Sequence, residues 1–186
     1  MVVIRKSVPD DAKIVVPLVI DAIGDISKRM TGEQEPIKIE QSLCELFRRE
    51  DNQHSYLYTY VAEIDSTIAG TMVLYSGEIA PKLDENLSTW LSEKNAKEVE
   101  IDPESLPDEL YINTVCVNPA FRGKGIGSKL LVFAEAIAKD AGISKVSLNV
   151  ETEKEAAIRL YKRSGYEIVS PWTIIGEPFH HMVKNV

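Results

Sequence analysis

The feature of this sequence that most constrains its fold is a glycine-rich, basic turn between a β-rich run and an amphipathic segment. Residues 110–117 alternate in the manner of a central strand, and Asn118-Pro119 ends that run. Apolar residues then recur at helical spacing from Gly125 until Ala141-Gly142. A strand that enters a helix through so short a connection predicts a protein of the α/β or α+β class.

The residues of this turn predict an anion-binding site. Gly123, Gly125 and Gly127 leave the backbone open to a ligand, and a helix N-terminus offers free amides and the positive end of its dipole. Arg122 and Lys124 add positive charge to a chain that is otherwise acidic. The turn matches neither a P-loop nor a dinucleotide fingerprint. A glycine-rich helix cap without a ligand is the alternative interpretation.

The rest of the chain predicts a mixed sheet with helices around it. Helices are expected from about Asp10, over 38–49 and over 152–164, and the last matches a capping box that starts at Thr152. The expected strands cover 2–5, 56–64, 68–75, 145–150, 166–169 and 180–184. Weak periodicity, prolines and excess negative charge over 81–107 indicate a solvated insertion with a short helix near 87–91.

Composition and charge exclude several classes of protein. The chain has 186 residues, which suits one domain, and no apolar run approaches the roughly 18 residues of a membrane span. Cys44 and Cys116 are far apart and near no metal-ligand cluster, so we expect neither a disulfide scaffold nor a metal site. A net charge of −8 disfavours nucleic acid as a partner. The first residues do not resemble a secretory signal, and the expected location is cytoplasmic.

Two blocks of the sequence resemble a known family. Residues 122–127, Arg-Gly-Lys-Gly-Ile-Gly, are similar to the Arg/Gln-x-x-Gly-x-Gly/Ala signature of the GNAT superfamily of N-acetyltransferases. Residues 148–150 and 157–166 resemble that family's second block, a strand followed by an Ala-x-x-Leu-Tyr-x-x-x-Gly-Phe helix. The resemblance implies one domain over 1–186, with a mixed, mostly antiparallel, twisted sheet of about six to seven strands and about four flanking helices. The acidic insertion lies at about 76–109.

The resemblance also implies acetyl-CoA as the co-substrate. The pyrophosphate of acetyl-CoA is expected to bind the loop of residues 122–127, called the signature loop below. The pantetheine arm is expected to lie along the strand that ends at Val117, and Asn149 is expected to hydrogen-bond an amide of this arm. The implied cofactor-binding residues are Val115, Cys116, Val117, Arg122, Gly123, Lys124, Gly125, Ile126, Gly127, Ser128, Asn149 and Tyr161. Lys154 departs from the family pattern, which commonly has Asn there.

The implied reaction is direct transfer of an acetyl group to an amine. Tyr161 stands at the family's tyrosine position and is the expected acid, while Glu109 is the expected base and Glu78 a second candidate. A covalent role for Cys116 is disfavoured, because no nearby group lowers its pKa. Alternatives are a non-catalytic CoA-binding or regulatory module and a pure interaction domain.

The acceptor is expected to be a small-molecule amine or an amine of a peptide or protein. The negative charge of residues 76–109 is a hypothetical attractant for a cationic amine. An exposed strand near the C-terminus is a candidate for pairing in a homodimer.

Overall fold

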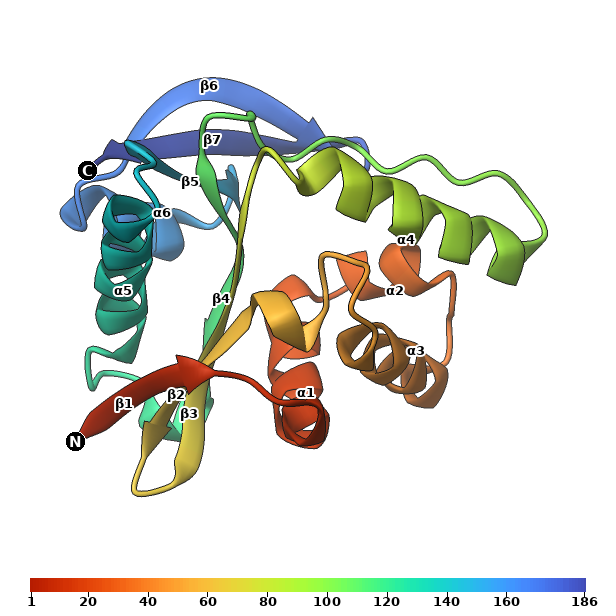
Figure 1. Ribbon diagram of the computed structural model, residues 1–186, viewed down its shortest axis with the longest axis horizontal. Helices are drawn as coiled ribbons and strands as arrows, with labels where there is room; N and C mark the ends of the chain where they lie inside the picture. The colour runs from red at the N-terminus through yellow and green to blue at the C-terminus, as the bar shows by residue number, and fades with distance from the viewer.

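One twisted seven-stranded sheet runs through the centre of the computed structural model, which describes residues 1–186 (Figure 1). Its strands are β1 (Val2–Lys6), β2 (Thr59–Ile64), β3 (Thr67–Ser76), β4 (Leu110–Val117), β5 (Lys145–Glu151), β6 (Glu167–Ile174) and β7 (Glu177–Asn185). They lie in the order β1-β2-β3-β4-β5-β7-β6, and β4 with β5 is the parallel pair among antiparallel neighbours. The predicted class and the mostly antiparallel sheet are confirmed.

Helices cover both faces of the sheet (Figure 1). On one face lie α1 (Ala12–Ile23), α2 (Ile26–Thr31), α3 (Pro36–Arg48) and α4 (Ala80–Asn95), and on the other α5 (Ile126–Asp140) and α6 (Glu155–Arg163). The six α-helices exceed the four that were expected. The six-residue α2 is too short to show a helical period, and α4 falls in the segment predicted to be a solvated insertion.

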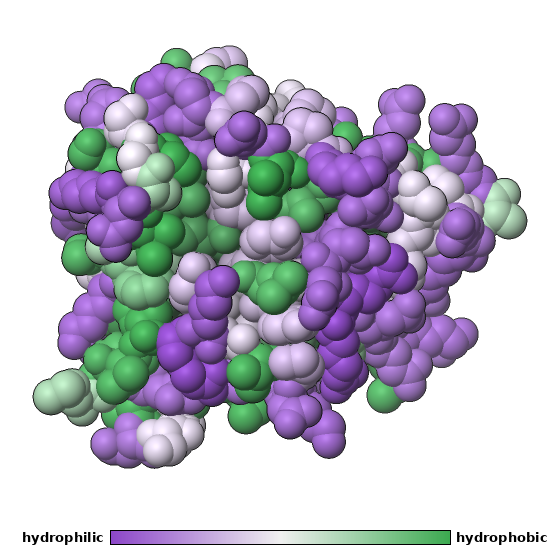
Figure 2. Space-filling model, viewed as in Figure 1, coloured by the Kyte–Doolittle hydropathy of each residue, from purple (hydrophilic) through white to green (hydrophobic).

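The solvated insertion is the largest error of the sequence-based fold. Helix α4 has 16 residues and buries Leu83, Leu87, Trp90 and Leu91. Its outer face carries the charges that hid this pattern, and the surface over α3 and α4 at the right of Figure 2 is mostly hydrophilic. One buried face is sufficient to anchor a helix whose other faces are charged.

Two main hydrophobic cores follow the two faces of the sheet. Strand side chains alternate between them, so that Ala62 packs with α5 while its neighbour Val61 packs with α1 and α3. Residues Ala157, Ile158 and Tyr161 of α6 pack against the α5 core. The cores hold α1 and α5 on opposite sides of β4.

The predicted capping box at the start of α6 is wrong. The helix begins at Glu155, Lys154 occupies the N-cap position, and no side chain caps the helix. Instead, the amide of Lys154 donates to the carbonyl of Glu151, and the amide of Thr152 donates to Pro178 on β7. Residues 151–154 are therefore a turn that leaves β5.

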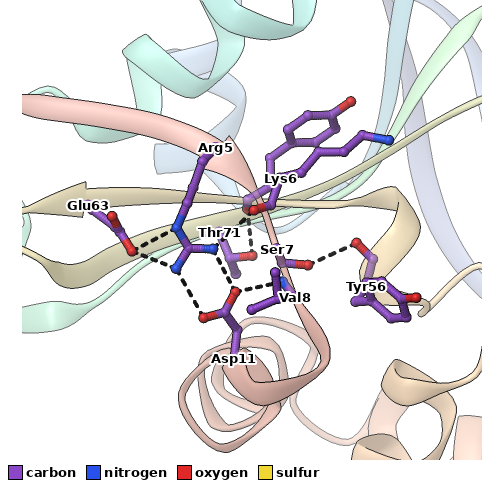
Figure 3. A network of polar contacts seen from close by, with 9 residues as sticks. Arg5, Lys6, Ser7, Val8, Asp11, Tyr56, Glu63 and Thr71 are labelled. Carbon is purple, nitrogen blue, oxygen red and sulfur yellow. Dashed lines mark hydrogen bonds and ion pairs between the residues drawn. The ribbon is translucent and has the colours of Figure 1, made fainter.

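An ion-pair network fixes the start of α1 to the edge of the sheet (Figure 3). The Arg5 guanidinium on β1 bonds Asp11 at 2.8 Å and Glu63 of β2 at 2.6 Å. Asp11 also accepts from the amide of Val8 at 2.8 Å. Burial opposes ionisation of Asp11, but the bonds from Arg5 and Val8 outweigh it and lower the pKa of this carboxyl. The network thus joins β1, β2 and α1.

Strand β6, rather than the final strand, forms the C-terminal edge of the sheet. Strand β7 lies between β5 and β6, so both of its edges are paired. Val169 on β6 is exposed. Pairing of two copies through this edge stays a prediction.

No helix of this protein combines the length and the apolar character that crossing a membrane requires. No group of three or more His, Cys, Asp or Glu side chains is arranged to hold a metal ion.

Candidate active site

The site begins where two parallel strands separate. Strands β4 and β5 are paired only from Leu110 opposite Val146 to Ile112 opposite Leu148. Beyond these pairs β4 continues to Val117 and β5 to Glu151. The backbone groups on the facing edges have no strand partner there, and such groups can pair with an extended ligand.

A cleft of about 500 Å³ occupies this opening. One part is lined by the end of β4, the signature loop and α6, and the other by α1, α2 and the ends of β6 and β7. Val115, Cys116 and Val117, which are predicted to bind the cofactor, line the first part. Burial raises the pKa of Cys116 to about 12, so this thiol remains protonated and is a poor nucleophile.

The signature loop meets the cleft at the start of α5. Arg122 and Gly127 line the cleft, and Gly123 and Gly125 have φ values of +76° and +72° with open space where a Cβ would lie. No side chain caps α5, and no backbone or side-chain acceptor of the protein receives the amides of residues 123–128. These free amides and Arg122 form a cradle that fits a pyrophosphate.

Not every residue of the predicted loop faces the cleft. The Ile126 side chain is 1% exposed and belongs to the α5 core, where it packs against Gly70. Lys124 is exposed and lies over the Phe121 ring, 4.9 Å from the ring centroid, and Ser128 is exposed on the first turn of the helix. Ile126 can therefore offer a ligand only its backbone.

Tyr161 reaches the cleft from α6, which lies on the face of the sheet opposite α1 and α2. It lines the cleft and lies edge-on to Tyr166, with the ring centroids 6.2 Å apart. Burial, with a smaller effect from Cys116, raises the pKa of Tyr161 to about 12. The phenol therefore keeps its proton and can donate it within the cleft.

Asn149 lines the cleft, but protein partners engage its amide. Its Nδ2 donates to the carbonyl of Glu104 at 2.7 Å, and its Oδ1 is 2.7 Å from Nδ1 of His181. The expected bond from Asn149 to a pantetheine amide would have to share these groups. The geometry gives Asn149 a structural role in fixing the segment before β4.

Glu109 does not line the cleft, and His181 lies between its carboxylate and the side-chain amide of Asn149. Its carboxylate is 1% exposed, 3.1 Å from His181 Nε2, and it accepts from Ser147 at 2.8 Å and from the amide of Leu106 at 3.1 Å. Burial raises its pKa, but these hydrogen bonds prevail and lower the pKa of Glu109. The structure does not place Glu109, the predicted base, among the residues that line the cleft, and Glu78 is exposed outside it.

Glu104, unlike Glu109, lines the cleft, as Asp21 of α1 and Glu151 of β5 also do. Its Oε2 accepts from the hydroxyl of Tyr111 at 2.8 Å and from the amide of Asn113 at 3.0 Å. Burial, together with the negative charges of Asp84 and Asp102, raises its pKa to about 7 despite these two bonds. A carboxylate with this pKa can accept a proton near neutral pH.

Long-range contacts bring Glu104 to this position. The chain returns from α4 to β4 past the tips of β6 and β7 (Figure 1), where Trp172 donates to the carbonyl of Pro103 at 2.9 Å. Asn113 points to Glu104 because β4 has an irregular register, with Ile112 opposite Leu74 and Thr114 opposite Val73. Sequence reasoning missed Glu104, since nothing local separates it from the other acidic residues of 76–109.

Comparison with known proteins defines the class. A profile of the Acetyltransferase (GNAT) family matches residues 20–166. A crystal structure of an acetyltransferase is 30% identical, with a TM-score of 0.78 and 99% of each chain covered. An N-acetyltransferase from Staphylococcus aureus is 25% identical, with a TM-score of 0.80 over 97% of this chain and 99% of that one. The chain belongs to the GNAT family of acetyltransferases.

Among curated relatives, an aminoalkylphosphonate N-acetyltransferase of Salmonella typhimurium is 27% identical over 67% of this chain and 86% of its own length. Other matches are shorter. The aligned region covers 16% of an uncharacterized protein of Mycobacterium leprae, which is 39% identical over 33% of this chain. An N-acetyltransferase from Thermoplasma acidophilum in complex with coenzyme A shares the fold, with a TM-score of 0.59 at 19% identity over 100% of this chain and 99% of that one.

Proposed function

We propose that this chain is an acetyl-CoA-dependent N-acetyltransferase that moves an acetyl group directly to a primary amine. The observation that carries the proposal is the split between β4 and β5, which has a cradle of free amides at one end and Tyr161 along its wall. Membership of the GNAT family supports the same activity.

Residues of the first part of the cleft would hold the co-substrate. The amides of 123–128 and the Arg122 guanidinium would bind its pyrophosphate, and the free edge of β4 from Val115 to Val117 would bind its pantetheine arm. When bound, acetyl-CoA supplies an acetyl thioester, an acyl donor whose sulfur is the leaving group. No metal takes part in this proposal.

Glu104 and Tyr161 would handle the protons. Glu104 takes a proton from the incoming ammonium, which frees the nitrogen lone pair for attack on the acetyl carbon. The new C–N bond forms as the C–S bond breaks, and Tyr161 donates its proton to the departing sulfur. The second proton of the attacking nitrogen then passes to the Tyr161 phenolate, and Glu104 releases its proton to solvent, so that one proton is released in each turnover. The two residues lie on different sides of the cleft, so each can serve one end of the reaction.

Calorimetric titration with acetyl-CoA tests the binding half of the proposal. Gly125→Glu places a carboxylate in the cradle, and Gly142→Glu is its matched control, because Gly142 has a φ of +70° and equally open surroundings at the other end of α5. We expect the wild type and Gly142→Glu to bind and Gly125→Glu to lose at least about tenfold in affinity, roughly 1.4 kcal/mol. Absence of binding by the wild type would reject the proposal.

Transfer is tested with Tyr161→Phe, and Tyr166→Phe is its control. The Tyr166 hydroxyl is buried without a hydrogen-bond partner, so its removal leaves the neighbouring ring in place. We expect Tyr161→Phe to bind acetyl-CoA normally and to lose roughly 10²-fold or more in kcat, with near-normal turnover by Tyr166→Phe. Binding without turnover by the wild type, over a broad panel of amines, would instead support the non-catalytic CoA-binding module.

The role of Glu104 is tested through the pH profile of kcat/KM for the acceptor. In the wild type the ascending limb should lie near pH 7, where Glu104 loses its proton. Glu104→Gln should remove that limb and lower kcat/KM by about 10²-fold or more. The exposed Glu100→Gln in the same segment should leave both unchanged. A limb that persists in Glu104→Gln would assign the base elsewhere.

A further inference from the structure

The acceptor side of the cleft is lined mainly by apolar side chains. From α1 and α2 these are Leu18, Ala22, Ile23, Ile26 and Met30, and from the ends of β6 and β7 they are Ile174 and Phe179. Such a lining fits a carbon chain or ring and offers little to a strongly hydrated group.

One cationic side chain, Lys154, reaches this side of the cleft, and it is paired with a carboxylate. The cleft is lined by two cationic side chains, Arg122 and Lys154, and Arg122 lies on the signature loop. Lys154 sits at the mouth, where its ammonium is 3.2 Å from Glu151 and donates to the carbonyl of Ala22 at 3.3 Å. Because Lys154 is already paired with Glu151 and Arg122 lies at the signature loop, neither cation is free to neutralise an acidic group carried by the acceptor.

Negative charge, in contrast, lies on the acceptor side. Glu104 is within the cleft, and Asp21 is exposed at its edge. An ammonium group would be attracted to both, whereas a carboxylate or phosphonate next to the amine would meet two like charges and an apolar wall.

A second groove of about 430 Å³ adjoins the mouth, and its acidic side chains are mostly paired. Glu177 is 3.6 Å from Arg29, Asp25 is 2.7 Å from Lys28, and Glu151 is paired with Lys154. The groove shares Asp21, Ala22 and Lys154 with the main cleft. Asp21 and Glu153 of this groove have no ion-pair partner, but both are exposed, so solvent and salt screen their attraction for a second cationic group of an acceptor.

We infer that the acceptor is a monoamine whose ammonium group is attached to an apolar carbon chain or ring and which carries no acidic group. This inference rests on the proposed function and specifies its substrate class. It also separates this chain from the relative named for aminoalkylphosphonates, whose substrates by name combine an amine with an anionic phosphonate.

Matched pairs of amines that differ by one group test the inference. Phenethylamine is compared with phenylalanine, and butylamine with 3-aminopropylphosphonate. Butylamine is also compared with putrescine, which adds a second ammonium. Thiol release from acetyl-CoA gives kcat/KM for each amine. Calorimetric binding of each amine to the protein without acetyl-CoA gives a second readout, which does not depend on the proposed reaction.

We expect each plain amine to exceed its acidic partner by at least about tenfold in kcat/KM and in affinity, because an unpaired anion in the cleft is costly. Putrescine should differ from butylamine by less than about threefold. Glu104→Gln should weaken the binding of phenethylamine, and Glu100→Gln should not.

Three results would overturn the inference. They are equal or better use of phenylalanine or the aminophosphonate, a gain of about tenfold or more with putrescine, and no binding of any plain amine. Failure of the proposed function is recognised separately, because acetyl-CoA would then not bind to the wild type while the amine-binding comparison could still be made.

Discussion

At the residue scale, two glutamates of one segment have opposite environments. Glu109 is ionised among donors from His181, Ser147 and Leu106, whereas Glu104 lines the cleft and has a raised pKa. The two are linked, because His181 bonds Asn149 and Asn149 holds the carbonyl of Glu104. His181 also packs against Trp172, with ring centroids 4.6 Å apart. Glu109 thus supports the position of Glu104 from behind.

The raised pKa of Glu104 predicts a cost in stability. Its pKa is about 7 in the folded protein against an ordinary 4.5, so its contribution to the free energy of unfolding is fully present below about pH 4.5 and is lost as the pH rises through 7. The free energy of unfolding in urea should fall between pH 5 and pH 8 in the wild type, and it should fall by less in Glu104→Gln. Glu100→Gln should behave as the wild type, and identical pH dependence in all three proteins would contradict the assignment.

At the element scale, α4 shows how a charged surface can conceal a core helix. Leu87 and Leu91 are each 1% exposed, and they pack with residues of α1 and α3. The indole nitrogen of Trp90 donates to Glu45 of α3 at 2.9 Å. The segment that follows α4 carries Glu104, so this helix also determines where the site is completed.

Leu87→Ala is predicted to destabilise the protein by about 2–5 kcal/mol, because it removes a fully buried side chain and leaves a cavity. The control is Leu106→Ala, since Leu106 is 43% exposed in the same connection. It should change the free energy of unfolding by less than about 0.5 kcal/mol in urea denaturation. Small effects from both substitutions would instead support the prediction that residues 81–107 form a solvated insertion.

The network around Arg5 gives a second element-scale prediction. Asp11→Asn weakens the bonds that join α1 to β1 and β2, and it should cost about 1–3 kcal/mol at pH 7. Because the pKa of Asp11 is lowered in the folded protein, its contribution to the free energy of unfolding is present above about pH 4 and is lost as the pH falls through the folded pKa. The difference in stability between Asp11→Asn and the wild type should therefore shrink in acid. Asp25→Asn, in an exposed pair with Lys28, should change stability little at either pH.

At the scale of the whole molecule, the sheet is divided by the point where β4 and β5 separate. The α5 core packs against both parts of the sheet, because it includes Leu110 of β4 as well as Val146 of β5 and Met182 of β7. The α1 core takes its strand residues from β2, β3 and β4 only. The cleft lies between these parts, so it collects residues from segments that are distant in sequence, from Leu18 to Phe179.

Hydrogen exchange should show this division. Saturating coenzyme A is expected to slow amide exchange at Val115, Val117 and residues 123–128 by about tenfold or more. The amides of alternate β4 residues face away from β3 toward the proposed binding edge, and those of 123–128 form the cradle. The amides of β1 and β2, on the far side of the sheet, should change little. Gly125→Glu should show no protection, and protection confined to other segments would place the ligand elsewhere.

The sequence by itself determined the features that depend on neighbouring residues. Gly123 and Gly125 permit the positive φ values of the loop, and the helical period from Ile126 forms α5. Tyr161 was identified through the resemblance of residues 157–166 to the second block of the family. Alternating apolar residues likewise predicted most strands of the sheet.

Only the tertiary structure decided which carboxylate reaches the cleft and what surrounds the acceptor. Glu104 and Glu109 are five residues apart and look alike in sequence. Their environments depend on hydrogen bonds from Tyr111, Asn113 and His181, and on the return of the chain past β6. The physical reason is that burial and pKa are set by contacts between distant segments, which local residue patterns do not specify.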